Sequence, residues 1–458
     1  MSDFNRFMKK GMRGHLIGIG GVSMSPLAEV LRDMGLHITG SDVAENENIK
    51  HLRELNIEVS IGHKASNLPA DAKFVIFTAA IHNDNPEICE AKARGLKIFG
   101  RAEAWGTIMK AYKNALCISG THGKTTTTSM CTHIMLASDQ DPTVMIGGTL
   151  PILHASHRVG KGDTIILEAC EYHDSFLEFS PTIATILDIE EDHLDYFSDI
   201  EHIKASFRRF AERTPENGIV VVNCDDEASM SAIEGIDRKI ITFGLSDKAD
   251  VYARKIKQVG MRSEFDIYYH GKKLTDVILH VPGLHNIKNA LAATASCIPL
   301  GVSSNAVKYG LAGFSGAGRR FEFKGKFNGA DIYDDYAHHP GELKVLLDAV
   351  GALGYERVIL VFQPHTYSRT KAFFDDFLRQ LKRPDVLYLA EIYAARESKL
   401  DISSKDLQEK ISGSIFSEDF DELIQMLRSA ARPGDIILTV GAGDVYIVGE
   451  RLVSEGVD

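Results

Sequence analysis

One short segment, residues 119–126 with the sequence SGTHGKTT, constrains the fold of this chain more than any other. It follows an apolar run at 115–118 and precedes a helical pattern at 126–137. A strand, a glycine turn, a Lys-Thr pair and a helix form the layout of a phosphate-binding loop, because backbone N–H groups and the positive helix end hold phosphate oxygens. Ile118 stands where the commonest form of this motif has glycine. A glycine turn with a solvated lysine is therefore the alternative at this point.

Length and charge indicate a globular protein of two to four domains. The chain has 458 residues and a formal net charge of −12, which argues against sequence-independent nucleic-acid binding because that needs a basic surface. Its six cysteines are scattered without a C-x-x-C pair, as expected in a reducing compartment. The N-terminal segment lacks a signal-peptide core, and no apolar stretch is long enough for a membrane span. We therefore predict a cytoplasmic protein that binds no nucleic acid.

The first module resembles a nucleotide-binding α/β unit and ends near residue 111. A predicted strand runs into the glycine-rich turn Gly18–Gly21, and a second short strand ends at Ser41 and Asp42. Glycines let the backbone approach a pyrophosphate, and an acid after the second strand can reach a ribose. Because Ser23 replaces the last glycine of the dinucleotide fingerprint, the pattern is weak support for NAD. It is better support for a nucleotide that carries a diphosphate.

Two predicted strands of the second module end in acidic residues. One strand at 164–167 runs into Glu168, and another at 182–189 runs into an acidic segment before His193. Ligands gather at the carboxyl ends of parallel strands, so we expect Glu168 to bind Mg²⁺ near Thr125. A solvated acid in a turn is the alternative. His193 is a candidate for a second metal or phosphate contact, although isolated histidines are usually structural.

Asn286 and Asn289 lie three residues apart before a helix predicted at 290–297. Both side chains should therefore face one side of the helix start. Amides in this position can recognise an adenine or cap the helix, and the sequence does not decide between the two.

A third α/β module begins near Gly313. A glycine-rich hinge precedes Arg319 and Arg320, and three further segments carry dense polar groups at the ends of predicted strands. These segments are 333–340, 363–370 and 391–397. The sheet edge of this module is therefore expected to carry functional groups.

Together the motifs resemble the Mur ligases, the ATP-dependent amide-forming enzymes of peptidoglycan synthesis. The resemblance covers residues 14–443. Its motifs, in chain order, are Gly18–Gly21 with Met24 and Ser25, Gly120–Thr126, Glu168 with Glu171, Asp192 with His193, His285 and Asn286 with Asn289, Gly318–Phe321, Asp334–Tyr336 with His338–Pro340, and Gln363–His365 with Arg369 and Thr370. The short phosphate loop G-T-x-G-K-T is the family's own form, which accounts for Ile118.

The resemblance implies an α/β protein of three domains. These would be a Rossmann-like N-terminal domain for the UDP substrate (1–111), a central P-loop-type ATPase domain (112–313) and a Rossmann-like C-terminal domain (314–458). The motifs are closest to the branch that joins L-alanine to UDP-N-acetylmuramate through an acyl phosphate, with ATP and Mg²⁺ as cofactors. The protein would act as a monomer or homodimer.

The resemblance also implies a role for each matching residue. The chemistry would be carried by Lys124, Glu168, His193, His338, His365 and Arg369. ATP would contact Gly120, Thr121, His122, Gly123, Lys124, Thr125, Thr126, Asn286, Asn289, Arg320 and Asp335. UDP would contact Gly18, Gly20, Gly21, Ser41, Asp42, Thr78 and Ala79. The Mg²⁺ ligands would be Thr125, Glu168 and His193.

Three residues depart from the family pattern. Cys170 stands where aspartate is commoner, Asp188 where asparagine is usual, and Arg396 interrupts a Tyr-Ala-x-Gly-Glu type of turn. A thiol does not replace a carboxylate as a ligand of a hard metal ion, so the first change concerns the geometry of the metal site. Glu168 is retained, and activity is expected.

Three other functions remain open from the sequence. A sister ligase that adds a preformed peptide to UDP-N-acetylmuramate shares nearly all the motifs. An NAD-dependent oxidoreductase would use the N-terminal fingerprint but leaves Lys124, Glu168 and Asp335 without a role. A non-catalytic homologue is disfavoured because Lys124, Thr125 and His193 are all present.

Overall fold

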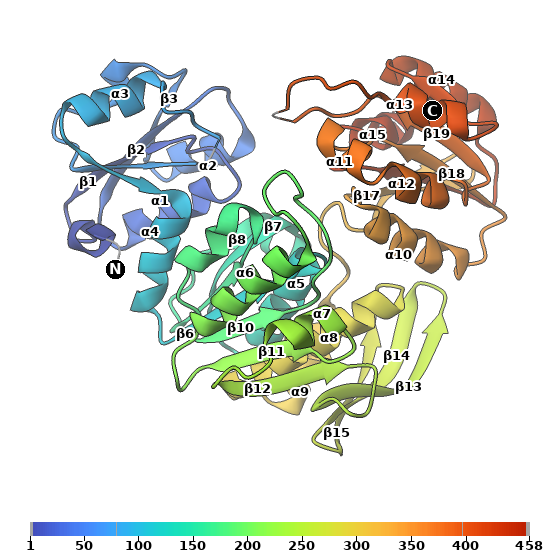
Figure 1. The fold of residues 1–458 in the computed structure, drawn as a ribbon, viewed down its shortest axis with the longest axis horizontal. Helices are drawn as coiled ribbons and strands as arrows, with labels where there is room; N and C mark the ends of the chain where they lie inside the picture. The colour runs from blue at the N-terminus through green and yellow to red at the C-terminus, as the bar shows by residue number, and fades with distance from the viewer. Residues whose placement is uncertain (1–2, 79, 396, 455–458) are drawn as a thin grey trace.

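The computed structural model describes residues 3–78, 80–395 and 397–454, which fold into three α/β domains, each built on its own sheet (Figure 1). This confirms the fold class predicted from the sequence. The domain limits at residues 111 and 313 stay a prediction. Among the described residues, no helix has the length and apolar character needed to cross a membrane.

The first domain is a parallel sheet of five strands in the order β3-β2-β1-β4-β5. In such a sheet the ligand crevice lies where the strand order reverses, which here is at the carboxyl ends of β1 and β4. Gly18 has a φ of 79°, a conformation that favours glycine, and it lets the chain turn away from β1. The elements are η1 (Asp3–Phe7), β1 (Arg13–Ile17), α1 (Met24–Asp33), β2 (His37–Asp42), α2 (Glu47–Glu54), β3 (Glu58–Ile61), η2 (Ala65–Asn67), β4 (Phe74–Phe77), α3 (Pro86–Ala93), β5 (Lys97–Gly100), α4 (Arg101–Ile108) and η3 (Met109–Ala111).

The central domain contains a ten-stranded sheet in the order β15-β14-β13-β12-β11-β10-β6-β9-β7-β8. The strands from β7 to β13 are parallel, and antiparallel strands close both ends. Its inner strands are nearly continuous apolar runs, as expected where helices cover both faces. The elements are β6 (Asn114–Ser119), α5 (Lys124–Ala137), β7 (Thr143–Leu150), η4 (Pro151–Leu153), β8 (Ala155–Arg158), β9 (Thr164–Glu168), η5 (Tyr172–Glu178), β10 (Ile183–Ile186), α6 (Ile200–Glu212), β11 (Ile219–Asn223), α7 (Glu227–Ala232), β12 (Lys239–Gly244), β13 (Val251–Val259), β14 (Arg262–Tyr269), β15 (Lys272–Leu279), α8 (Leu284–Cys297), η6 (Ile298–Leu300) and α9 (Ser304–Gly313).

The third domain has a six-stranded sheet in the order β16-β17-β21-β18-β19-β20, in which only β16 is antiparallel. Helix α10 begins with a capping box formed by His339 and Glu342. The elements are β16 (Glu322–Phe327), β17 (Ala330–Asp335), α10 (Pro340–Gly351), β18 (Arg357–Phe362), α11 (Tyr367–Ala372), α12 (Phe374–Leu381), β19 (Val386–Ala390), α13 (Ser404–Lys410), β20 (Ile415–Ser417), α14 (Phe420–Ala430), β21 (Asp435–Val440) and α15 (Tyr446–Ser454).

The buried cores show how the domains are joined. A single apolar cluster runs from Phe4 and Trp105 in the first domain to Phe176 and Phe210 in the central domain. Among the described residues, the two largest clusters of the third domain contain no buried side chain from elsewhere, and from outside that domain only the partly buried Met261 packs against one of them. The first two domains therefore share a core, whereas the third has its own.

Candidate active site

The phosphate-binding loop connects β6 to α5 at the carboxyl edge of the central sheet. Gly120 and Gly123 have φ values of 145° and 79°, which favour glycine, and α5 begins at Lys124. The helix therefore starts two residues before the segment predicted from the sequence, so its positive end lies directly after the glycine turn. A Cβ atom at Gly123 would lie 2.6 Å from Asn289 Oδ1, which shows how closely the loop approaches α8.

Lys124 points back over the loop toward Glu171. Its Nζ donates hydrogen bonds to the carbonyl oxygens of Gly120 and Thr121 and lies 3.1 Å from Glu171 Oε2. Burial alone would lower the pKa of Lys124, but the Glu171 carboxylate and neighbouring groups outweigh it and raise the pKa. The side chain is therefore a mostly buried cation beside the loop.

Glu168 and Thr125 meet at the end of β9. Thr125 Oγ1 donates to Glu168 Oε2 at 3.2 Å, and the backbone N–H of Gly147 donates to Glu168 Oε1 at 2.6 Å. Burial raises the pKa of Glu168 in spite of these hydrogen bonds. A hydroxyl and a partly buried carboxylate beside a phosphate loop are oxygen donors of the kind that Mg²⁺ takes, so these residues fit that ion.

His193 lies across from Glu171 in a left-handed backbone conformation, with a φ of 54°. Its Nε2 is 3.8 Å from Glu171 Oε1, and its ring stacks on Tyr172 with the centroids 4.4 Å apart. Burial lowers the pKa of His193 although Asp192 and Glu171 are nearby. The imidazole is therefore held in the neutral form that can bind a metal ion.

Two adjoining cavities lie on either side of the phosphate loop. The smaller, of about 210 Å³, is lined by seven predicted ATP-site residues, His122, Gly123, Thr126, Asn286, Asn289, Arg320 and Asp335. The larger, of about 840 Å³, is lined among others by Lys124, Thr125, Glu168, His193 and His338. Gly123 and Arg320 border both cavities. The structure thus brings central-domain and third-domain residues to one continuous site.

The two asparagines lie inside α8 rather than before it, because the helix starts at Leu284 instead of the predicted residue 290. Its N-cap residue is Gly283, so neither asparagine occupies the capping position. Asn286 Nδ2 donates to the Pro282 carbonyl at 2.7 Å, and Asn289 Nδ2 donates to Asn286 Oδ1 at 3.4 Å. Both residues line the smaller cavity, as a contact to a bound ligand requires.

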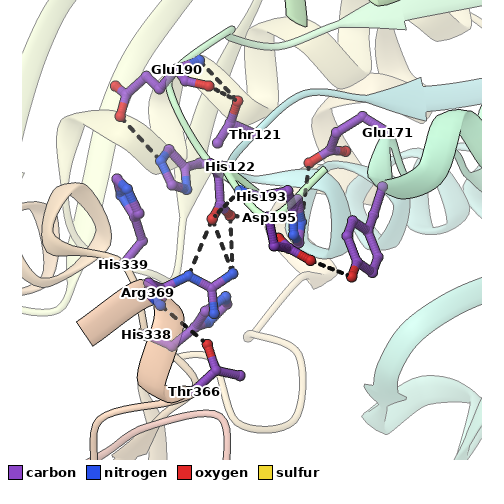
Figure 2. Close-up of polar contacts among 12 residues, drawn as sticks. Thr121, His122, Glu171, Glu190, His193, Asp195, His338, His339, Thr366 and Arg369 are labelled. Carbon is purple, nitrogen blue, oxygen red and sulfur yellow. Dashed lines mark hydrogen bonds and ion pairs between the residues drawn. The ribbon is translucent and has the colours of Figure 1, made fainter. Parts of the chain in front are cut away.

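Arg369 in α11 forms an ion pair with Asp192 of the central domain, and Figure 2 shows this arginine beside His338. Arg369 Nη2 is 3.0 Å from Asp192 Oδ1, and both side chains are about nine-tenths buried. Burial would raise the pKa of Asp192, but Arg369 outweighs it and holds the pKa well below its usual value. The pair therefore fixes the third domain against the loop that carries His193.

His338 and His365 lie together on the third domain with ring centroids 5.6 Å apart. Arg369 Nη1 is 3.1 Å from His365 Nδ1. Burial lowers the pKa of His338 to about 4 and that of His365 to about 3. Both rings are therefore neutral at neutral pH.

His122 makes a second polar bridge between the domains. Its Nε2 is 3.2 Å from Glu190 Oε2, and its Nδ1 is 3.4 Å from Glu342 Oε1 in α10 (Figure 2 shows the first contact). Burial would lower the pKa of His122, but the two carboxylates outweigh it and raise the pKa well above its ordinary value. The sequence reasoning missed Glu342, although its place three residues after His339 at a helix start is a capping-box signal.

Two further residues of the site were not predicted. The Gly147 N–H orients Glu168, and a Cβ atom at Gly147 would lie 2.6 Å from Glu168 Oε2. Glu171, quoted only as part of a motif, links Lys124 to His193. Gly147 and Gly148 in β7 give no sequence signal for such a role, because β7 and β9 come together only in the folded sheet.

The described residues among the predicted UDP contacts lie at the carboxyl edge of the first sheet. Gly20 N donates to Asp42 Oδ2 at 2.8 Å, and a Cβ atom at Gly18 would lie 2.7 Å from Thr78 Cγ2. Gly21 follows in the same turn, and its N–H donates to the Gly18 carbonyl. The hydroxyl of Ser41 points inward to Glu87 Oε2, at 2.5 Å. Ala79 lies outside the described residues.

Of the three residues that depart from the family pattern, Cys170 and Asp188 lie in different parts of the site. Cys170 lines the larger cavity. Asp188 supports the phosphate loop, because its Oδ1 accepts a hydrogen bond of 2.8 Å from His122 N, and burial raises its pKa to about 6. Arg396 lies outside the described residues.

Family models cover nearly all of the chain. The model for the Mur ligase family, catalytic domain, matches residues 13–113. The Mur ligase middle domain matches residues 118–297, and the Mur ligase, glutamate ligase domain, matches residues 319–443.

Proteins of known name are similar over the whole length. The UDP-N-acetylmuramate–L-alanine ligase of Clostridium novyi is 44% identical over 455 residues, covering 98% of this chain and 99% of the relative. That of Agathobacter rectalis is 45% identical over 447 residues, covering 96% and 97%. The crystal structure of the UDP-N-acetylmuramate–alanine ligase of Thermotoga maritima superimposes with a TM-score of 0.81 at 28% identity, covering 97% of this chain and 99% of the other.

Proposed function

The chain belongs to the Mur ligase family, and we propose that it joins L-alanine to UDP-N-acetylmuramate in an ATP-dependent reaction that releases ADP and phosphate. The observation that carries this proposal is the identity of 44% with UDP-N-acetylmuramate–L-alanine ligase over 98% of the chain. Family membership leaves no support for the oxidoreductase alternative. Because ATP is a substrate, we place the reaction in the cytoplasm.

We assign the two cavities to the two ends of ATP. The smaller cavity holds the nucleoside, where Asn286, Asn289 and Asp335 offer amides and a carboxyl group. The phosphate loop and Lys124 hold the phosphates, and Arg320 borders both cavities. Thr125, Glu168 and His193 would hold Mg²⁺, which would supply positive charge near the transferring phosphoryl group.

The larger cavity is the site of amide formation. A carboxylate is a poor electrophile, so the lactyl carboxylate first accepts the phosphoryl group to give an acyl phosphate, which the amine of alanine attacks. Lys124 and Arg320 offset the repulsion between the two anionic reactants. A tetrahedral intermediate then expels phosphate.

The third domain positions the incoming amino acid. His338 and His365 are neutral, and with a pKa of about 4 and about 3 they are weak bases. We infer that they orient the amine by accepting its hydrogen bonds rather than by removing a proton. Arg369, beside His365, contributes positive charge near the reacting carboxyl group.

A phosphate-release assay tests this function. The purified protein is given ATP, Mg²⁺ and UDP-N-acetylmuramate with a panel of single amino acids and with the tripeptide of the sister reaction. Release with L-alanine and little with the tripeptide is the expected result. A methyl-sized pocket discriminates by only about 1–3 kcal/mol, so weak activity with glycine is compatible with the proposal. Release with the tripeptide alone would indicate the sister ligase, and none with any substrate would exclude both.

A further inference from the structure

Glu29, His51 and His157 come together where the first domain contacts the central domain, well outside the residues assigned to the reaction. Glu29 lies in α1, His51 in α2 and His157 in β8. In Figure 1, β8 lies on the side of the central sheet nearest the first domain. The cluster therefore joins two domains through three separate elements.

The three side chains converge on one point. His157 Nε2 is 2.9 Å and His51 Nε2 is 3.2 Å from the same oxygen, Glu29 Oε2. One potential ligand atom from each residue lies within 4.8 Å of the other two. Metal bonds of about 2.0–2.1 Å in a tetrahedral site place neighbouring ligand atoms about 3.3 Å apart, so small side-chain shifts would admit an ion.

The chemistry of the donors selects the class of ion. Two imidazoles and one carboxylate suit zinc and similar transition metals, whereas Mg²⁺ and Ca²⁺ take oxygen ligands. His157 is buried and Glu29 is mostly buried, but the side chain of His51 is 45% exposed. An ion can therefore enter past His51, and water can complete its coordination.

We propose that Glu29, His51 and His157 form a binding site for a transition-metal ion of the zinc class, which ties the first domain to the central domain. In this site the ion replaces the protons that the two imidazoles share with the carboxylate. It is distinct from the Mg²⁺ of the reaction in both ligands and location. The proposal does not depend on which amino acid the enzyme uses.

The surroundings of His157 indicate how tightly the proposed site should bind a metal ion. Among the described residues, its second ring nitrogen, Nδ1, is buried without a hydrogen-bond partner. Histidine ligands of tight sites usually donate this second nitrogen to a carbonyl or carboxylate, and loss of such support lowers affinity roughly 10–100-fold. We therefore expect reversible binding that a chelator removes without unfolding the protein.

The test is a titration of the chelator-treated full chain with Zn²⁺ in excess Mg²⁺, followed by calorimetry. His122, Glu190 and His339 also meet the geometric criterion for a metal-binding group. All proteins therefore carry His122→Gln, which removes that competing group. The variants are Glu29→Gln, His51→Gln and His157→Gln, and the matched control is His37→Gln, which removes an exposed histidine of the first domain.

We expect each cluster variant either to bind one Zn²⁺ ion fewer than the parent or to bind it at least about 100-fold more weakly. Losing a metal ligand should weaken binding at least as much as losing the hydrogen-bond partner that orients a ligand. The His37→Gln control should bind as the parent does. Co²⁺ should give the visible absorption of a nitrogen-coordinated ion only with the intact cluster, and Zn²⁺ should raise the thermal transition of the parent but not of His51→Gln. His51 is half exposed, so this variant remains informative if His157→Gln disturbs folding. Equal Zn²⁺ binding by the parent and His51→Gln would overturn the proposal.

Discussion

The two joints between the domains are built differently. The first and central domains share one apolar cluster, and α4 lies so close to η5 that a Cβ atom at Gly106 would be 1.9 Å from the Glu178 carbonyl oxygen. The central and third domains meet instead through ion pairs, chiefly Arg369 with Asp192 and His122 with Glu342. We call the first of these two contacts the apolar joint and the second the polar joint. Apolar burial is lost only when large surfaces separate, whereas a few ion pairs can break and form again in water.

We expect the contact held by shared apolar burial to stay fixed and the contact held by ion pairs to open. Phosphoryl transfer needs water excluded while it occurs and access for substrates before and after. Both cavities of the site border the polar joint, because Arg320 of the third domain lines both and Asp335 lines the smaller one. We therefore expect the third domain to move while the first two move as one unit.

The largest effect is expected from Arg369→Ala. This change leaves the carboxylate of Asp192 buried without its cation, and breaking a buried pair in this way costs about 3–5 kcal/mol. The third domain should separate from the central domain, which small-angle scattering would detect as an increased radius of gyration. Arg383→Ala is the matched control, because its pair with Asp348 lies within the third domain and is partly exposed, so it should cost about 1 kcal/mol or less. Equal scattering curves for the two variants would contradict a polar joint that depends on Arg369.

Lys124→Ala should lower turnover without weakening the binding of UDP-N-acetylmuramate, because we assign the two functions to different domains. Removing a cation aimed at a developing charge typically lowers turnover by about 10²–10³-fold. Binding of UDP-N-acetylmuramate, which we assign to the first domain, should stay nearly unchanged in calorimetry. Lys110→Ala, which removes an exposed lysine, serves as the control for both measurements. If Lys124→Ala abolishes substrate binding as well, the assignment of the two ligands to different domains is wrong.

The apolar joint is tested by Gly106→Ala. Alanine usually favours a helix over glycine, but here the new methyl group would collide with the Glu178 carbonyl. Overpacking of this kind costs about 1–3 kcal/mol, so the thermal transition shared by the first two domains should fall. Gly351→Ala is the control, because this glycine ends α10 and a Cβ atom there has no neighbour within 4 Å. A fall of the same size in the control would remove the argument for a tightly packed joint.

The sequence predicted the parts of the site that depend on local pattern. The phosphate loop and the acid at the end of β9 follow from glycine spacing and from where a parallel strand ends, and the structure has them at the predicted positions. The boundaries of α5 and α8 were placed too late, because polar residues at a helix start resemble a loop in sequence.

What the sequence could not give are contacts between distant segments. Arg369 and Asp192 are 177 positions apart, and Glu29 and His157 are 128 apart. No spacing rule connects such residues, since their distance is set by how whole domains pack. The Mur resemblance located several of these side chains, but not Glu342, and it gave no indication of the cluster between the first two domains.

The smallest expected effect is a pH dependence of the polar joint, which we attribute to the titration of His122. This ring faces Glu190, Glu342 and Asp188, and the ring of His339 lies 5.2 Å away. The acidic neighbours raise the pKa of His122. The stabilisation that the protonated ring gives to the polar joint is therefore fully present below the ordinary histidine pKa of about 6.5, and it is lost as pH rises through the raised value. Scattering by the complex with an ATP analogue should therefore show the third domain loosening under alkaline conditions. His122→Gln should remove this dependence at high pH, and a dependence that persists in the variant would show that another group titrates at the joint.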